Sequence, residues 1–144
     1  MADEVKWAYL AGILDGEGSM SITHRGDRSS NSYEYIIQVY STDLVLINWV
    51  QGYFGGRIYA DERNRHPGER WGHKPINRIG WHSKEDIAYI LEGVIPYLVI
   101  KKDLAQALHN FVITPMAEKE MRELAFVNTK LFSRTGQNHS MEVN

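Results

Sequence analysis

The spacing of apolar and polar residues switches along the chain between a helical and a strand pattern. Apolar residues recur at helical spacing over residues 4–15, which predicts a first helix that starts after acidic residues and ends at two glycines. From Ser19 apolar and polar residues alternate, and a second stretch rich in β-branched and aromatic residues covers 33–41. Both are predicted strands, and the polar run 26–32 between them is a predicted loop.

The second half of the chain repeats this alternation of helices and strands. Asp43 is a natural N-cap, and two glycines close the helix that follows it. The predicted elements are a helix over 44–54, strands over 57–63 and 74–82, and helices over 84–92, 96–112 and 116–127.

The predicted order α-β-β-α-β-β-α-α-α is typical of an α+β domain. Four antiparallel strands covered by helices on one face leave the other face for solvent or a partner. We expect one domain over residues 1–132 and a flexible C-terminal tail over 133–144.

Composition narrows the functional classes. The 144 residues carry a net charge of −2 and no cysteine, which excludes a disulfide scaffold and a thiolate metal site. No apolar run approaches the roughly 20 residues of a membrane span, and the first residues lack a secretory pattern. We expect an intracellular protein, in the cytoplasm, nucleoid or an organelle matrix. The net charge argues against a nucleic-acid binder, but residues 57–78 hold six basic and three acidic side chains, so charge is segregated.

The first helix carries the most informative residues. Gly12 and Gly16 are four residues apart and share one helix face without side chains, which allows another helix to approach closely. Glu17 falls at the end of the same helix, so its carboxylate projects beyond it. Asp15 points to a different side, and we assign it a structural role at the helix junction.

Residues 10–18 read LAGILDGEG and resemble the signature of the LAGLIDADG homing endonucleases. The predicted order over residues 5–113 also resembles the αββαββα core of that family. The resemblance implies a saddle-shaped four-stranded antiparallel sheet with helices on one face. It implies a site-specific endonuclease that hydrolyses double-stranded DNA at a long pseudo-palindromic site and leaves short 3′ overhangs.

The resemblance also implies a divalent metal site. It assigns metal binding to Glu17, with help from the backbone carbonyl of Gly16. Oxygen ligands suit Mg²⁺; Mn²⁺ is expected to substitute, and Ca²⁺ to support binding without cleavage. By the same resemblance, Lys101 assists the attacking water (Lys102 if the alignment is shifted by one), and Ser41 is a polar helper, with Gln38 as an alternative. The segment 44–50 lacks the basic residue that some relatives carry there.

A single motif implies a C₂ homodimer in which the first helices of two copies pack together. This arrangement places the two Glu17 carboxylates close to the axis. The expected interface residues are Leu10, Gly12, Ile13 and Gly16.

Alternate strand positions on the helix-free face are expected to contact DNA. Arginine forms bidentate contacts with guanine, glutamine with adenine, and hydroxyl groups bind base edges or phosphates. The expected DNA-binding residues are Ser21, Thr23, Arg25, Arg28, Gln38, Tyr40, Arg57, Tyr59, Arg63, Lys74 and Arg78.

Two other interpretations stay open. One is a protein of the same fold that binds without cleaving, such as an RNA-splicing maturase or a DNA-binding regulator. The other is an unrelated α+β protein that dimerises through its glycine-containing helix. The acid Glu17 favours the endonuclease over the first alternative.

Overall fold

A computed structural model describes residues 3–24, 33–61, 74–115, 121 and 123–132 of the chain. A further helical segment covers residues 123–132. The other elements are α1 (Glu4–Glu17), β1 (Gly18–His24), β2 (Tyr33–Ser41), α2 (Leu44–Phe54), β3 (Arg57–Tyr59), β4 (Asn77–Trp81), α3 (Lys84–Val94), the 3₁₀ helix η2 (Ile95–Tyr97) and α4 (Lys102–Ile113).

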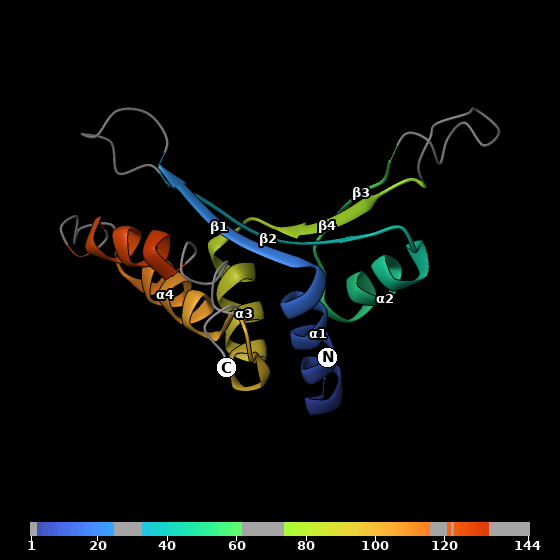
Figure 1. Ribbon diagram of the computed structural model, residues 1–144, viewed down its shortest axis with the longest axis horizontal. Coiled ribbons are helices and arrows are strands. Elements are labelled where there is room, and N and C mark those ends of the chain that lie inside the picture. The colour runs from blue at the N-terminus through green and yellow to red at the C-terminus, as the bar shows by residue number, and fades with distance from the viewer. Residues whose placement is uncertain (1–2, 25–32, 62–73, 116–120, 122, 133–144) are drawn as a thin grey trace, which may run out of the picture.

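The four strands form one antiparallel sheet in the order β1-β2-β4-β3. Figure 1 shows the helices packed on one side of this sheet, while the other side is a shallow trough without helices. The α+β class and the one-sided helical layer are therefore as predicted. Within the described ranges, no helix combines the length and hydropathy that crossing a bilayer requires.

Helix α1 is fixed at its start by Asp3, whose carboxylate accepts the backbone N–H of Lys6 at 3.0 Å. Its buried residues Leu10, Ala11 and Leu14 face the core. The helix extends two residues beyond the predicted end and leads directly into β1. This extension keeps the acidic end of the motif helical.

Buried positions alternate along the strands with positions that face away from the helices. The register places Ile37 opposite both Met20 of β1 and Trp81 of β4, so one buried row crosses the sheet. The Trp81 indole N–H donates to the Phe54 carbonyl at 3.1 Å and joins β4 to the end of α2. The buried strand side chains are Met20, Ile22, Ile37, Val39, Asn77, Ile79 and Trp81, and Gly80 is also buried.

Strands β3 and β4 are shorter than predicted. The backbone N–H of Asp61 donates to the Asn77 side chain at 3.0 Å, and Ile76 donates to the Asp61 carboxylate at 3.1 Å. These side-chain hydrogen bonds take the place of the regular ladder. Lys74 consequently precedes β4 instead of lying on it.

The long helix predicted over 96–112 is wrong in its first part. Pro96 lies in the short 3₁₀ helix η2, the chain is extended at Leu98, and α4 begins only at Lys102. The break results from a contact between segments far apart in the sequence, because the N–H groups at positions 99–101 bind the carboxylate of Asp15. The last described helix continues beyond the predicted end at 127 and includes residue 132, the last residue that the structure describes. The predicted boundary of the domain at 132 stays a prediction, and residues 133–144 lie outside the described ranges.

Candidate active site and nucleic-acid interface

Glu17 lies at the corner between α1 and the sheet. It is the last residue of the helix, its side chain is exposed, and Gly18 follows as the first residue of β1. A β-carbon at Gly18 would lie 2.7 Å from the Cα of Leu14, so the chain turns past the helix too closely for any side chain. The pocket beside the corner is lined by Glu17, Tyr40, Ser41, Thr42 and Ile76.

Lys101 binds the end of α1 through its side chain. Its ammonium group donates to backbone carbonyl oxygens at 2.6 Å (Leu14), 3.1 Å (Asp15) and 2.9 Å (Gly18). Positive charge is favourable there, because the carbonyls at a helix C-terminus carry partial negative charge. Burial lowers the pKa of Lys101, and the charges of Asp15 and Glu17 oppose this shift. The ammonium group therefore interacts electrostatically with Glu17, while its N–H groups donate to three backbone carbonyl oxygens.

Asp15 also joins the end of α1 to the segment that precedes α4. Its carboxylate accepts the backbone N–H groups of Val99, Ile100 and Lys101 at 2.8, 3.2 and 3.0 Å. The structural role assigned to Asp15 from the sequence is confirmed. Asp15 and Lys101 thus exchange side-chain and backbone hydrogen bonds, and they fix the helix end that carries Glu17.

Ser41 shares the pocket with Glu17 and also shapes the turn into α2. Its hydroxyl oxygen accepts the backbone N–H of Asp43 at 3.0 Å. Asp43 in turn is the N-cap of α2 and accepts the N–H of Val45 at 2.8 Å. The structure therefore brings Ser41 to Glu17, while the ammonium group of Lys101 contacts backbone carbonyl oxygens at the same helix end.

The face of α1 opposite the core carries Val5, Tyr9, Gly12 and Gly16, and we call it the glycine stripe. Val5 is 78% and Tyr9 54% exposed. A β-carbon at either glycine would meet nothing within 4 Å. This stripe is an uncovered apolar helix face with a flat, side-chain-free half.

The expected interface residues divide into two groups. Gly12 and Gly16 are exposed on the glycine stripe, and Ile13 is half-buried beside it. Leu10 has no exposed surface and belongs to the core of its own chain. Its placement in an interface is wrong, because the helical period turns position 10 toward the sheet.

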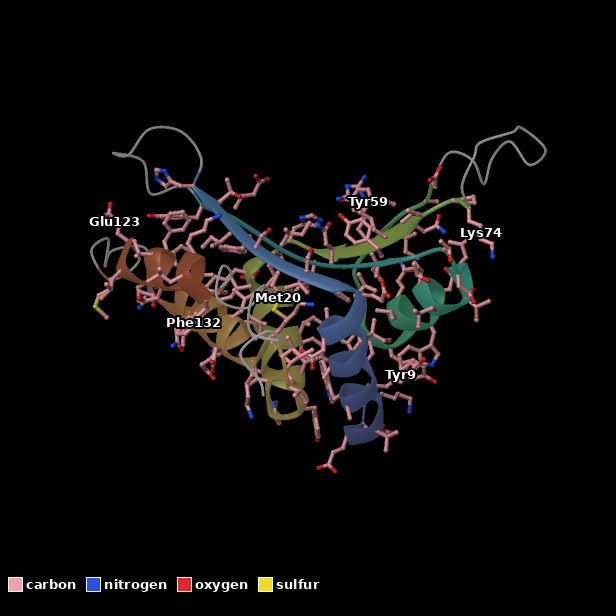
Figure 2. All side chains as sticks on the ribbon, in the orientation of Figure 1. Tyr9, Met20, Tyr59, Lys74, Glu123 and Phe132 are labelled. Atoms are coloured by element: carbon pink, nitrogen blue, oxygen red, sulfur yellow. The ribbon has the colours of Figure 1, made fainter. Side chains whose placement is uncertain are left out.

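Seven of the expected DNA-binding residues lie on strands at positions that alternate with the buried ones. They are Ser21, Thr23, Gln38, Tyr40, Arg57, Tyr59 and Arg78. Figure 2 shows the direction of this alternation, with Tyr59 on the helix-free side and Met20 on the helix side. Lys74 is exposed at the rim of the sheet, before β4 begins. Arg25, Arg28 and Arg63 lie outside the described residues.

Five side chains on the helix-free face contact one another, and we call them the Arg78 cluster: Gln38, Arg57, Tyr59, Arg78 and His82. The Cζ atoms of Arg78 and Arg57 lie 4.2 and 5.1 Å from the centre of the Tyr59 ring. Arg78 Nη1 donates to Gln38 Oε1 at 3.1 Å. The Tyr59 hydroxyl and His82 Nε2 are 3.3 Å apart. His82 is not among the predicted site residues, although its spacing of four residues from Arg78 places it on the same face of the strand.

The metal-binding capacity of one chain is small. Among the described residues, no group of three or more His, Asp or Glu side chains is arranged to hold a metal ion. The corner instead offers one exposed carboxylate, Glu17, beside backbone carbonyl groups. An ion that keeps waters and takes one or two carboxylates together with substrate phosphate fits this donor set, which is the usual coordination of Mg²⁺.

Comparison with known proteins identifies the fold. No protein-family model and no curated protein matches the chain. Among solved structures, it is similar to the homing endonuclease I-CvuI in complex with its target in the presence of calcium (TM-score 0.67, 14% identity, 91% of this chain and 82% of that chain). It is also similar to the archaeal intron-encoded homing endonuclease I-Vdi141I complexed with DNA (TM-score 0.65, 12% identity, 95% and 85%).

A third similar structure is a longer protein. The LAGLIDADG homing endonuclease I-SmaMI bound to cleaved DNA matches with a TM-score of 0.62 and 18% identity, over 92% of this chain but 43% of that chain. The chain therefore has the fold of the LAGLIDADG homing endonucleases, as the motif at residues 10–18 and the order of elements predict.

Proposed function

We propose that this chain is a LAGLIDADG-type homing endonuclease that cuts both strands of a long pseudo-palindromic DNA site as a homodimer. The observation that carries the proposal is the position of Glu17. An exposed carboxylate ends a helix whose outer face carries only glycine in its second half, at the corner where the helix-free face of the sheet begins. The similarity to DNA complexes of homing endonucleases supports the same assignment.

Glu17 and the Gly16 carbonyl are the groups that would hold Mg²⁺. Both are oxygen donors, the class of ligand that this ion prefers. Lys101 binds the carbonyl groups of three neighbouring residues, and Gly16 is not one of them. Bound Mg²⁺ supplies positive charge that stabilises the leaving 3′ oxygen of the scissile phosphodiester.

The residues of the chain position the reaction around this carboxylate. Attack of water in line at phosphorus breaks the P–O3′ bond and leaves 5′-phosphate and 3′-hydroxyl ends. Ser41 lines the same pocket as Glu17 and orients that water through its hydroxyl group. Asp15 and Lys101 keep the end of α1 in place, and Lys101 adds a positive charge near the reacting phosphate.

The second half of the active site comes from a second copy. One chain carries one Glu17, and cutting two strands takes two such carboxylates. The glycine stripe ends beside Glu17, so two stripes packed about a two-fold axis bring the carboxylates together. The two Glu17 carboxylates would hold divalent cations, whose charge would offset the repulsion of two like charges. The apolar, exposed residues Val5 and Tyr9 extend the surface that the dimer would cover.

A cleavage selection tests the proposal. A randomised duplex library is incubated with the chain in Mg²⁺, and the ends of cut products are sequenced. We expect cuts at one family of pseudo-palindromic sites with short 3′ overhangs, cutting also in Mn²⁺, and binding without cutting in Ca²⁺. Glu17→Gln should abolish cutting but retain binding. Glu4→Gln, which neutralises an exposed acid at the opposite end of α1, should cut like the parent.

Two results would contradict the proposal in different ways. If Glu17→Gln cuts as well as the parent, Glu17 is not the metal ligand. If the parent enriches specific duplexes but never cuts them in Mg²⁺ or Mn²⁺, the chain is a non-cleaving DNA-binding protein of this fold.

A further inference from the structure

Arg78 lies on an interior strand of the helix-free face. Strand β4 is bordered by β2 and β3, and Arg78 is opposite Tyr40 on one side and Tyr59 on the other. The major groove is about 12 Å wide and admits a two-stranded ribbon. Because neighbouring strands are about 4.8 Å apart, the pair β2–β4 fits the groove floor. The edge strands β1 and β3 then lie nearer the phosphates.

Two contacts hold the guanidinium of Arg78 in one orientation. Gln38 Oε1 accepts a hydrogen bond from Nη1 at 3.1 Å, and the ring of Tyr59 packs against Cζ at 4.2 Å. The register explains the first contact, because Gln38 is opposite Gly80 and therefore diagonal to Arg78. A side chain that is already ordered loses less conformational entropy on binding.

Gly80 makes room for this arrangement. It lies between Gln38 and Arg57 in the register, and a β-carbon there would come within 3.1 Å of His82 Nε2. The imidazole therefore occupies the space over Gly80 and reaches the hydroxyl of Tyr59. The Tyr59 ring is fixed at its hydroxyl as well as against both guanidinium groups.

The N–H donors of Arg78 that do not bind Gln38 match the acceptors of one base. Arginine has five N–H donors, and the contact with Gln38 uses one. Guanine presents two acceptors, O6 and N7, in the major groove, where a guanidinium can bind both. Adenine presents an N6 amino donor in place of O6, which a guanidinium cannot accept.

We infer that Arg78 reads a guanine in each half-site and that Gln38 and Tyr59 are positioning residues for this contact. Gln38 then acts through Arg78 and does not read adenine itself. This inference rests on the proposed function, because it takes the helix-free face as the surface that meets duplex DNA.

Selection of bound duplexes tests this assignment without cleavage. The parent and its variants are each incubated with randomised duplexes in Ca²⁺, and the bound fraction is sequenced. For the parent we expect a guanine preference of roughly 5- to 150-fold at one symmetric position of both half-sites, the range that one bidentate contact supplies. Arg78→Met removes all five N–H donors, and it should lose this preference while the other positions are unchanged.

Three further variants separate the roles in the cluster. Gln38→Glu keeps the acceptor for Arg78 and should retain the guanine preference. Gln38→Leu removes the acceptor and should weaken the preference at the same position. Lys84→Met, which removes an exposed positive charge at the start of α3 in the helical layer, is the control, and it should leave the base profile unchanged.

The outcomes distinguish this inference from the proposed function. An unchanged base profile in Arg78→Met would overturn the role of Arg78 while specific DNA binding stands. Loss of a base preference at a different position in Gln38→Leu would show that Gln38 reads a base directly. Failure of the parent to enrich any duplex would overturn the proposed function, and this inference with it.

Discussion

The ammonium group of Lys101 lies 2.6 Å from the carbonyl oxygen of Leu14, and this contact joins residues 87 positions apart in the chain. The backbone N–H of Lys101 simultaneously donates to the carboxylate of Asp15. The end of α1 and the start of α4 therefore hold each other through reciprocal hydrogen bonds. Because Glu17 and Gly18 follow directly, this junction decides where the candidate metal ligand lies relative to the sheet.

Replacing Lys101 should destabilise the fold more than replacing its neighbour. Lys101→Met keeps the length of the side chain but leaves three carbonyl groups without their charged donor. Hydrogen bonds to charged groups contribute about 1.5–3 kcal/mol, so we expect a loss of about 2–3 kcal/mol in the free energy of unfolding, measured in urea. Lys102→Met changes an exposed lysine and should stay within about 0.5 kcal/mol of the parent. An equal loss of unfolding free energy in both variants would contradict a stabilising role for the hydrogen bonds between Lys101 and the end of α1.

Lys101 should also titrate at lower pH than an ordinary lysine side chain. Burial disfavours its charged form, so its pKa in the folded chain lies below the ordinary value of 10.5. At pH values between the pKa of Lys101 in the folded chain and its pKa in the unfolded chain, the unfolded chain binds more protons. The contribution of Lys101 to the free energy of unfolding therefore rises with pH in this range. NMR of ¹³C-labelled lysine should show a resonance with a pKa below the ordinary lysine value, which is absent in Lys101→Met and present in Lys102→Met. Loss of that resonance in Lys102→Met instead would contradict the assignment.

How much the sequence predicts depends on whether the determining contacts are local. The motif helix and the inward phases of Met20 and Ile37 follow from periods of 3.6 and 2 residues. The break at 98–101 does not, because it depends on Asp15, more than 80 residues earlier in the chain. The same holds for the mutual contacts of the Arg78 cluster. Strand alternation predicts that its members share a face, but only the register shows that Arg78 and Gln38 are diagonal neighbours.

Gly18→Ala should disturb the corner that carries Glu17. The added β-carbon would lie 2.7 Å from backbone and side-chain atoms of Leu14, so the helix end or the strand must shift. Overpacking of this kind costs about 1–3 kcal/mol, which thermal unfolding would measure as a lowered Tm. Gly52→Ala is the control, because Gly52 is an exposed helical glycine with nothing within 4 Å of its β-carbon position. A Tm for Gly18→Ala at or above that of Gly52→Ala would contradict the close approach.

Gly12→Leu should dissociate the proposed homodimer without unfolding the chain. The β-carbon position of Gly12 is open within one chain, so leucine adds no internal clash, but it stands between two glycine stripes packed together. At micromolar concentration, sedimentation velocity should give the parent twice the mass of the 16.6 kDa chain. Gly12→Leu should raise the dimer dissociation constant at least about tenfold, since a misfitted helix interface loses more than about 1.4 kcal/mol. Gly52→Leu, which places the same side chain on α2 outside the stripe, should dimerise like the parent. A parent that stays monomeric both free and on DNA would contradict the paired site, because a single Glu17 would then have to act on both strands.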